Sequence, residues 1–152
     1  MENIKKILAV SWITQSCQRT VHEAASLATK YDAELSVIHV IDTSWAHNWT
    51  FPLKLYEEER RKGMEKAKSE LDGVIEPEKK SGLKIKTVIK DGDPVEEILD
   101  FIKKEKIDLL VINASEESRI EQFMIGGSTD AIIRKMPCSI FLVKSESKKK
   151  ST

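Results

Sequence analysis

Five short runs of aliphatic residues constrain this chain more than any other feature of its sequence. Four of them are almost continuously apolar and cover Ile7 to Val10, Leu35 to Ile41, Leu109 to Ile112 and Ile140 to Val143. Apolar runs of this length are typical of strands that are covered on both faces, as in a parallel sheet. The fifth run, Ile85 to Ile89, alternates with lysine and threonine. This alternation favours a strand with one wetter face, nearer to an edge of the sheet.

Helical patterns fill the gaps between these runs. Apolar residues recur at spacings of three and four from Val21 to Tyr31, and they do so again from Val95 to Ile102. The second stretch follows Asp93, a favourable N-cap residue, and Pro94, whose missing N–H costs nothing in the first turn of a helix. Both stretches therefore predict amphipathic helices.

Two further helices are predicted. A charged segment from about Leu53 to Glu78 indicates a long and mostly exposed helix, with Pro77 expected to end it. The last helix is expected from about Ser128 to Lys135, because Pro137 moves the residue before it out of the helical region.

Together these elements predict the order βαβαβαβαβ. Strands that are joined through helices run parallel with right-handed crossovers, so we expect a doubly wound α/β fold with a five-stranded parallel sheet sandwiched by helices. Residues 1–144 are expected to form a single domain, and the lysine-rich stretch 145–152 a disordered polar tail. In such sheets ligands bind outside the carboxyl ends of the strands, here the loops after Val10, Ile41 and Ile112.

Composition argues against several classes of function. The 25 lysines and arginines balance the 25 aspartates and glutamates, so no overall charge favours nucleic acid. No stretch is apolar enough for a membrane span or a secretory signal. Cys17 and Cys138 lie far apart and outside any metal-ligand motif. We therefore expect a cytoplasmic protein without a metal site and without a nucleic-acid or membrane partner.

Three motifs toward the C-terminus lie in the order found in a known family. The sequence DLLVINAS from Asp108 to Ser115 is followed by MIGGST from Met124 to Thr129, and then by RKMPCSIFLV from Arg134 to Val143. This arrangement closely resembles the universal stress protein family, and the resemblance covers about residues 4 to 144. It implies a Rossmann-like fold of the adenine nucleotide alpha hydrolase-like type and a role as a small stress-response or regulatory protein.

Members of this family that bind ATP carry the pattern Gly-x2-Gly-x9-Gly-Ser/Thr after the fourth strand. Glycines let backbone N–H groups approach the phosphates, and a helix N-terminus adds positive potential. In this chain the four positions are Asn113, Glu116, Gly126 and Gly127, and one of the four matches. Glu116 also introduces a carboxylate, and at about 5 Å with an effective dielectric constant of about 20 it repels each phosphate charge by roughly 3 kcal/mol.

The end of the first strand departs from the family as well. Relatives commonly have an aspartate beside the nucleobase at the position of Ser11, and Trp12 then replaces a small residue. We therefore predict a degenerate nucleotide pocket that binds ATP weakly or not at all. Its predicted residues are Val10, Ser11, Val40, Asn113, Glu116, Gly126, Gly127, Ser128 and Thr129.

An alternative stays open for the segment from Gly126 to Thr129. Consecutive glycines before a helix offer several N–H donors, which could hold the phosphate of ATP or AMP together with magnesium. The segment could instead turn the chain and cap the helix through Ser128 or Thr129. The first interpretation describes a nucleotide-binding signalling module, and the second a regulatory protein without a cofactor.

No catalytic residues are predicted. The sequence contains no nucleophile elbow, metal-ligand cluster or intact phosphate loop. His22 and His47 have no nucleophile or carboxylate at a motif spacing, and His39 lies within a predicted strand, where we expect it to be packed and hydrogen-bonded. An enzyme of the wider adenine nucleotide hydrolase-like group, which would cleave or transfer a phosphate, is the remaining catalytic alternative.

Two segments are candidate interaction surfaces. Aromatic residues gather in the loop from Trp45 to Phe51, which either contacts a protein partner or folds back over the sheet. The last strand leaves an apolar edge that consists of Ser139, Ile140, Phe141, Leu142 and Val143. The family resemblance implies a homodimer in which this strand pairs antiparallel with its own copy about a two-fold axis.

Overall fold

The computed structural model describes residues 3–12, 17–43, 53–114 and 127–144. Five parallel strands form one sheet in the order β3-β2-β1-β4-β5. The strands are β1 (Lys6–Val10), β2 (Glu34–Asp42), β3 (Ile85–Gly92), β4 (Leu109–Ala114) and β5 (Ser139–Lys144). The helices are α1 (Cys17–Tyr31), α2 (Leu53–Lys79), α3 (Pro94–Glu105) and α5 (Gly127–Lys135). The predicted doubly wound α/β fold is confirmed.

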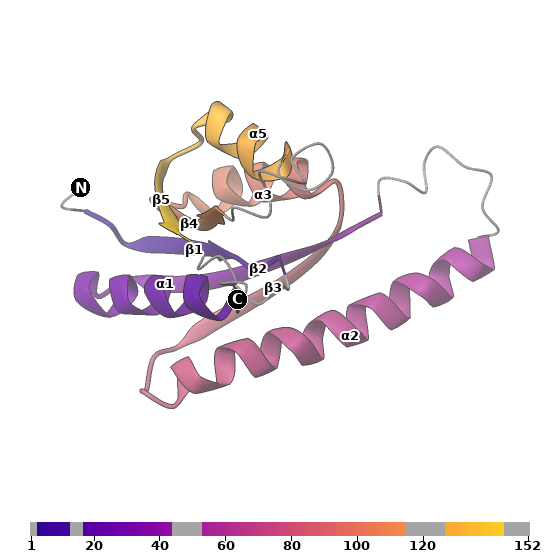
Figure 1. The fold of residues 1–152 in the computed structure, drawn as a ribbon, viewed down its shortest axis with the longest axis horizontal. Coiled ribbons are helices and arrows are strands. Elements are labelled where there is room, and N and C mark those ends of the chain that lie inside the picture. The colour runs from indigo at the N-terminus through magenta and orange to yellow at the C-terminus, as the bar shows by residue number, and fades with distance from the viewer. Residues whose placement is uncertain (1–2, 13–16, 44–52, 115–126, 145–152) are drawn as a thin grey trace, which may run out of the picture.

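Helices cover both faces of the sheet, with α1 and α2 on one face and α3 and α5 on the other (Figure 1). Side chains alternate between the two faces along each strand. On β1, Ile7 and Ala9 belong to the apolar layer under α1 and α2, whereas Leu8 and Val10 belong to the layer under α3 and α5. The inner strands are therefore apolar on both faces at most positions, which explains their nearly continuous runs in the sequence.

The two edges of the sheet differ in character. On β3 the side chains of Lys86, Thr87 and Lys90 are exposed, in agreement with the edge position predicted from its alternation. Lysines on an edge strand oppose pairing with another chain. On β5 the exposed residues are Ser139, Phe141, Leu142 and Lys144, so two of the four are large and apolar. Among the described residues, the β5 edge is therefore the more apolar of the two.

Helix α3 begins and ends as its sequence predicts. The Asp93 carboxylate accepts hydrogen bonds from the N–H groups of Val95 at 2.9 Å and Glu96 at 3.3 Å. Lys106 closes the helix in the left-handed conformation, with φ 54°. These caps satisfy backbone groups that a helix leaves unpaired at its ends.

Helix α2 corrects one prediction, because Pro77 lies within the helix, which continues to Lys79. A proline ring crowds the carbonyl four residues earlier and gives it no N–H partner. That residue is the exposed Gly73, so water can hydrate its carbonyl and the last turn survives. The helix is held to the core by three buried side chains, those of Ala67, Leu71 and Ile75.

Strands β2 and β3 continue as a two-stranded ribbon beyond the end of β1. The last pair of β1 with β2 is Val10 with Ile38, whereas β2 and β3 remain paired as far as Asp42 and Gly92. Figure 1 shows the N-terminal half of α2 running along this ribbon, past the body of the sheet. Within the described ranges, no helix combines the length and apolarity that a membrane span requires.

An ion pair ties α2 to the ribbon. The Arg60 guanidinium donates from Nε to Asp91 Oδ2 at 2.7 Å and from Nη2 to Oδ1 at 3.2 Å. These hydrogen bonds lower the pKa of Asp91 and raise the pKa of Arg60. Both side chains are partly exposed, so solvent screens the pair and its contribution to stability is small.

Candidate functional site

The carboxyl ends of β1 and β4 lie side by side in the centre of the sheet. After β1 the chain continues to β2 and β3 on one side, and from β3 it crosses to β4 and β5 on the other side of β1. This is therefore the switch point at which such folds bind ligands. The register pairs Ala9 with Val111, and continuing it by two residues puts Ser11 opposite Asn113. Both residues are buried, at 0% and 6% exposure, so two polar residues lie within the interior at this point.

The predicted nucleotide residues divide between the two faces of the sheet. The alternation that places Ala9 under α1 continues to Ser11. Val10 and Val40 are buried in the opposite layer, under α3 and α5. The structure therefore brings Val10 and Val40 to the face on which α5 packs, whereas the side chain of Ser11 belongs to the other face.

Helix α5 begins with the remaining described part of the predicted phosphate segment. Gly127 is its first residue, and Ser128 and Thr129 follow in the first turn, where their side chains are half-buried. Asp130 also lies in this turn and is exposed, so a carboxylate already occupies the positive end of the helix dipole. Glu116 and Gly126 lie outside the described residues.

Trp12 lies two residues beyond the end of β1, next to the predicted nucleotide residues Val10 and Ser11. Its side chain packs against the apolar layer that contains Val10, Ile38 and Val40. Its indole Nε1 is buried and has no hydrogen-bond partner among the described residues, and the same holds for Ser11 Oγ. Leaving a buried donor without a partner costs about 1–3 kcal/mol. The indole is therefore held in this layer by packing and by its backbone.

His39 connects β2 to the end of β1. Its half-buried imidazole lies with Nδ1 2.7 Å from the backbone carbonyl oxygen of Ser11. A carbonyl only accepts, so Nδ1 donates. The prediction that His39 is packed and hydrogen-bonded within the strand is confirmed. No local pattern predicts its partner, because the bond joins residues 28 positions apart.

Two other titratable candidates, His22 and Cys138, lie in separate parts of the described structure. His22 Nδ1 lies 3.3 Å from both carboxylate oxygens of Glu78, in a pair between α1 and α2 whose histidine is 66% exposed. Burial raises the pKa of the Cys138 thiol, which makes its thiolate scarcer at neutral pH. Among the described residues, no three side chains form a group suited to a metal ion. His47 and the segment from Trp45 to Phe51 lie outside the described residues.

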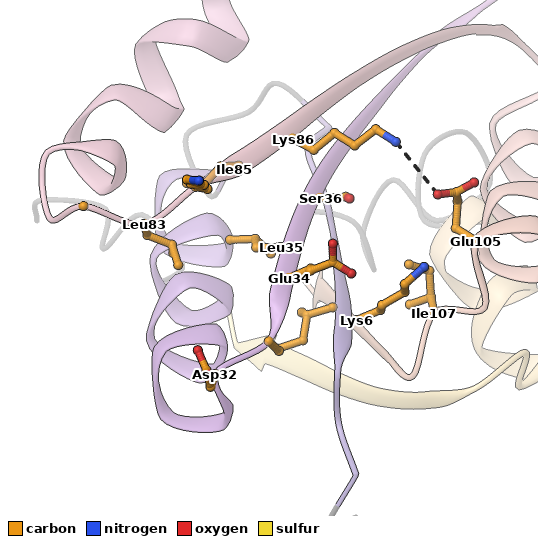
Figure 2. Close-up of a pocket in the computed structure, with 14 residues that line it drawn as sticks. Lys6, Asp32, Glu34, Leu35, Ser36, Leu83, Ile85, Lys86, Glu105 and Ile107 are labelled. Carbon is orange, nitrogen blue, oxygen red and sulfur yellow. Dashed lines mark ion pairs between the residues drawn. The ribbon is translucent and has the colours of Figure 1, made fainter.

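A groove that the sequence did not predict lies at the opposite end of the sheet. Figure 2 shows it at the amino ends of β1, β2 and β3, and its volume is about 540 Å³. Three lysines and three carboxylates are among its lining residues, and Lys86 Nζ lies 3.8 Å from Glu105 Oε1. The lining includes Lys6, Lys84, Lys86, Asp32, Glu34 and Glu105, so positive and negative side chains balance. The groove has no charge preference for a phosphate and contains none of the predicted site residues.

Strand β5 pairs with β4 from Ser139 to Lys144 and lies at an edge of the sheet. Phe141 is 39% exposed and Leu142 is 49% exposed, on opposite faces of the strand. Ile140 is half-buried and Val143 is buried. The predicted dimer residues thus form a strand edge flanked by exposed apolar side chains.

Comparison with known proteins identifies the family. The model of the universal stress protein family matches residues 3–144. Universal stress protein MJ0531 of Methanocaldococcus jannaschii is 27% identical over 97% of this chain and 86% of its own. The universal stress protein UspA of Lactobacillus plantarum has a TM-score of 0.78 at 23% identity, over 93% of this chain and 98% of its own.

A second solved structure carries a ligand. The universal stress protein from Archaeoglobus fulgidus, solved in complex with dAMP, has a TM-score of 0.64 at 18% identity, over 95% of this chain and 100% of its own. At this level of identity the likeness establishes the common fold. The family match, which spans nearly the whole domain, goes further, and the chain belongs to the universal stress protein family.

Proposed function

We propose that this chain is a non-catalytic regulatory protein of the cytoplasm whose switch-point crevice holds ATP weakly or not at all. The position of Trp12 is the observation that carries the proposal. Its indole packs in the same layer as Val10 and Val40, the residues at which the family resemblance places the nucleotide. An adenosine seated there would have to displace the indole.

Electrostatic repulsion also opposes ATP binding, as the steric conflict with Trp12 does. Asp130 in the first turn of α5 reduces the attraction of the helix N-terminus for a phosphate. Glu116 adds a second carboxylate in the family's phosphate-binding pattern. Ser11, in turn, supplies no carboxylate for the nucleoside. A triphosphate bound to this chain would therefore meet the carboxylate of Glu116 where ATP-binding members of the family have a glycine.

Isothermal titration with ATP, ADP and AMP, with and without magnesium, tests the proposal. We expect no binding of ATP with a dissociation constant below about 100 µM, and binding tighter than that would overturn it. Trp12→Thr is expected to strengthen AMP binding, because it vacates the adenosine position. Tyr31→Thr removes an exposed aromatic side chain at the end of α1, next to the amino end of β2, and is expected to leave AMP binding unchanged.

The second candidate function is that of an adenine mononucleotide-binding module. It is favoured by the half-buried hydroxyl residues Ser128 and Thr129 at the start of α5, and by the dAMP bound in the Archaeoglobus fulgidus structure. A monophosphate carries less charge than ATP and is repelled less by Glu116 and Asp130. Binding of AMP or dAMP at least as tight as about 100 µM, with ATP weaker, would support this candidate over the first.

We further propose that the protein is a homodimer that forms through β5. The contrast between the lysines of β3 and the exposed Phe141 and Leu142 of β5 supports this edge as the one that pairs. In such a dimer the two copies of β5 would run antiparallel across a two-fold axis. The loop from Trp45 to Phe51 is the proposed contact for a different protein partner, on the basis of its aromatic content.

A further inference from the structure

Both backbone groups of Ser11 are tied to β2 at the point where β1 leaves the sheet. The Ser11 N–H donates to the carbonyl of Ile38 at 2.9 Å, and the Ser11 carbonyl accepts from His39 Nδ1 at 2.7 Å. The regular pairing of β1 with β2 ends one residue earlier, at Val10. The imidazole therefore supplies a side-chain donor at Ser11, where β2 holds the backbone of the chain as it leaves β1.

The chemistry of this contact requires a hydrogen on Nδ1 of the imidazole. Because a carbonyl oxygen has no proton to give, Nδ1 of His39 carries the hydrogen, and Nε2 is the acceptor nitrogen of the neutral ring. A ring protonated at both nitrogens also donates from Nδ1. The contact thus requires a donor at one particular atom, and side chains of similar size without that donor cannot replace it.

The next residue along the chain is Trp12, and its placement depends on this turn. The buried Nε1 of its indole has no hydrogen-bond partner among the described residues. Exposure to water would give that N–H a partner, so hydration favours release of the indole and packing opposes it. No hydrogen bond from the indole to a described residue holds it, and the backbone at Ser11 therefore has a direct influence on where it lies.

We propose that His39 is a positioning residue that holds Trp12 in the crevice by donating from Nδ1 to the Ser11 carbonyl, and so controls access to the nucleotide position. This inference rests on the proposed function, in which Trp12 occupies the place of adenosine. Loss of one hydrogen bond of ordinary strength changes an equilibrium by about fivefold, so we expect the fraction of protein with an exposed indole to rise by about that factor.

Three substitutions of His39 separate its donor from its bulk. His39→Asn keeps an N–H donor near the position of Nδ1, whereas His39→Gln places its amide near the position of Nε2. His39→Leu has no hydrogen-bonding group at either position. Each is made in a background with Trp45→Phe and Trp49→Phe, so that Trp12 is the single tryptophan. Circular dichroism identifies the variants that fold, and His39→Gln serves as the variant without the donor if His39→Leu does not fold.

Acrylamide quenching of Trp12 fluorescence measures the exposure of the indole. We expect increased quenching in His39→Leu and His39→Gln, and quenching like that of the parent in His39→Asn. Equal quenching in all four proteins, or equal increases in the Asn and Gln variants, would overturn the role of the donor. The ¹⁵N spectrum of the unsubstituted protein is an independent readout: a neutral His39 protonated at Nε2 instead of Nδ1 would also overturn it.

Titration of the same variants with AMP distinguishes this inference from the function on which it rests. Increased quenching with tighter AMP binding in His39→Gln supports both. Increased quenching with unchanged AMP binding supports the positioning role of His39 and contradicts the exclusion of nucleotide by Trp12. Unchanged quenching in His39→Gln overturns the positioning role, whereas Trp12→Thr still tests the exclusion of nucleotide by Trp12.

Discussion

Substitution of Leu142 by lysine tests self-association through β5. Leu142 is 49% exposed, so about half of its side chain is available to be buried against a second copy. Full burial of a leucine contributes roughly 1.5–3 kcal/mol, so this half contributes about 1 kcal/mol in each copy. The two-fold axis brings the substitution into the interface twice, so the loss totals about 2 kcal/mol. This raises the dissociation constant of the dimer about 30-fold. The two added ammonium groups would weaken the contact further.

Sedimentation velocity over a series of micromolar concentrations measures the effect. We expect the parent protein to be dimeric and Leu142→Lys to dissociate at concentrations about 30-fold higher than the parent requires. Thr87→Lys adds the same charge at an exposed position on β3, the opposite edge, and is expected to change nothing. A monomeric parent, or equal dissociation of the parent and Leu142→Lys, would refute the reasoning.

Three further predictions concern charge and capping. Ser11→Asp, Asn113→Gly and Glu116→Gly together should create or strengthen ATP binding by titration calorimetry, and Glu116→Gly alone should give a smaller gain. If the triple variant binds no better than the parent, charge and loop sterics do not close the site. Asp93→Ala should lower the free energy of unfolding in urea by about 1 kcal/mol, whereas Asp100→Ala on the same helix should cost less. Because Arg60 lowers the pKa of Asp91 in the folded state, their pair stabilises the fold above the unfolded pKa of about 4 and is lost as the pH falls through the lowered value. Asp91→Asn should thus cost less than about 1 kcal/mol at neutral pH and nothing in strong acid, and a cost that persists in acid would assign the effect to packing.

Apolar pattern was enough to predict the sheet, because burial on both faces leaves a direct trace in the sequence. The continuous runs became the inner strands and β5, and the alternating run became the edge strand β3. The continuation of β3 to Gly92 left no such trace, since Lys90 and Asp91 are polar. Their place in the strand depends on pairing with β2 and on Arg60 of α2, contacts that a local pattern does not encode.

The end of α2 was predicted incorrectly for a related reason. Pro77 is a strong local signal, but its effect depends on the residue four positions earlier. At that position Gly73 is exposed and has no Cβ, so its carbonyl can turn toward water. Prediction of the site has the same limit. The sequence shows that Ser11 and Trp12 depart from the family pattern, but it cannot show that His39 contacts Ser11.

The fold and the proposed nucleotide site depend on different residues. Nucleotide affinity can therefore change without loss of the fold. The two apolar layers are built mainly from the strand interiors and the helix stripes, and both are complete beneath the carboxyl edge of the sheet. Trp12 packs against one of these two layers, and its indole N–H has no hydrogen-bond partner among the described residues. Replacing it should therefore cost less stability than truncating a core residue such as Ile98, for which about 2–5 kcal/mol is expected on substitution by alanine. Nucleotide affinity should respond in the opposite order: strongly to Trp12→Thr, and to Ile98→Ala only through loss of folded protein.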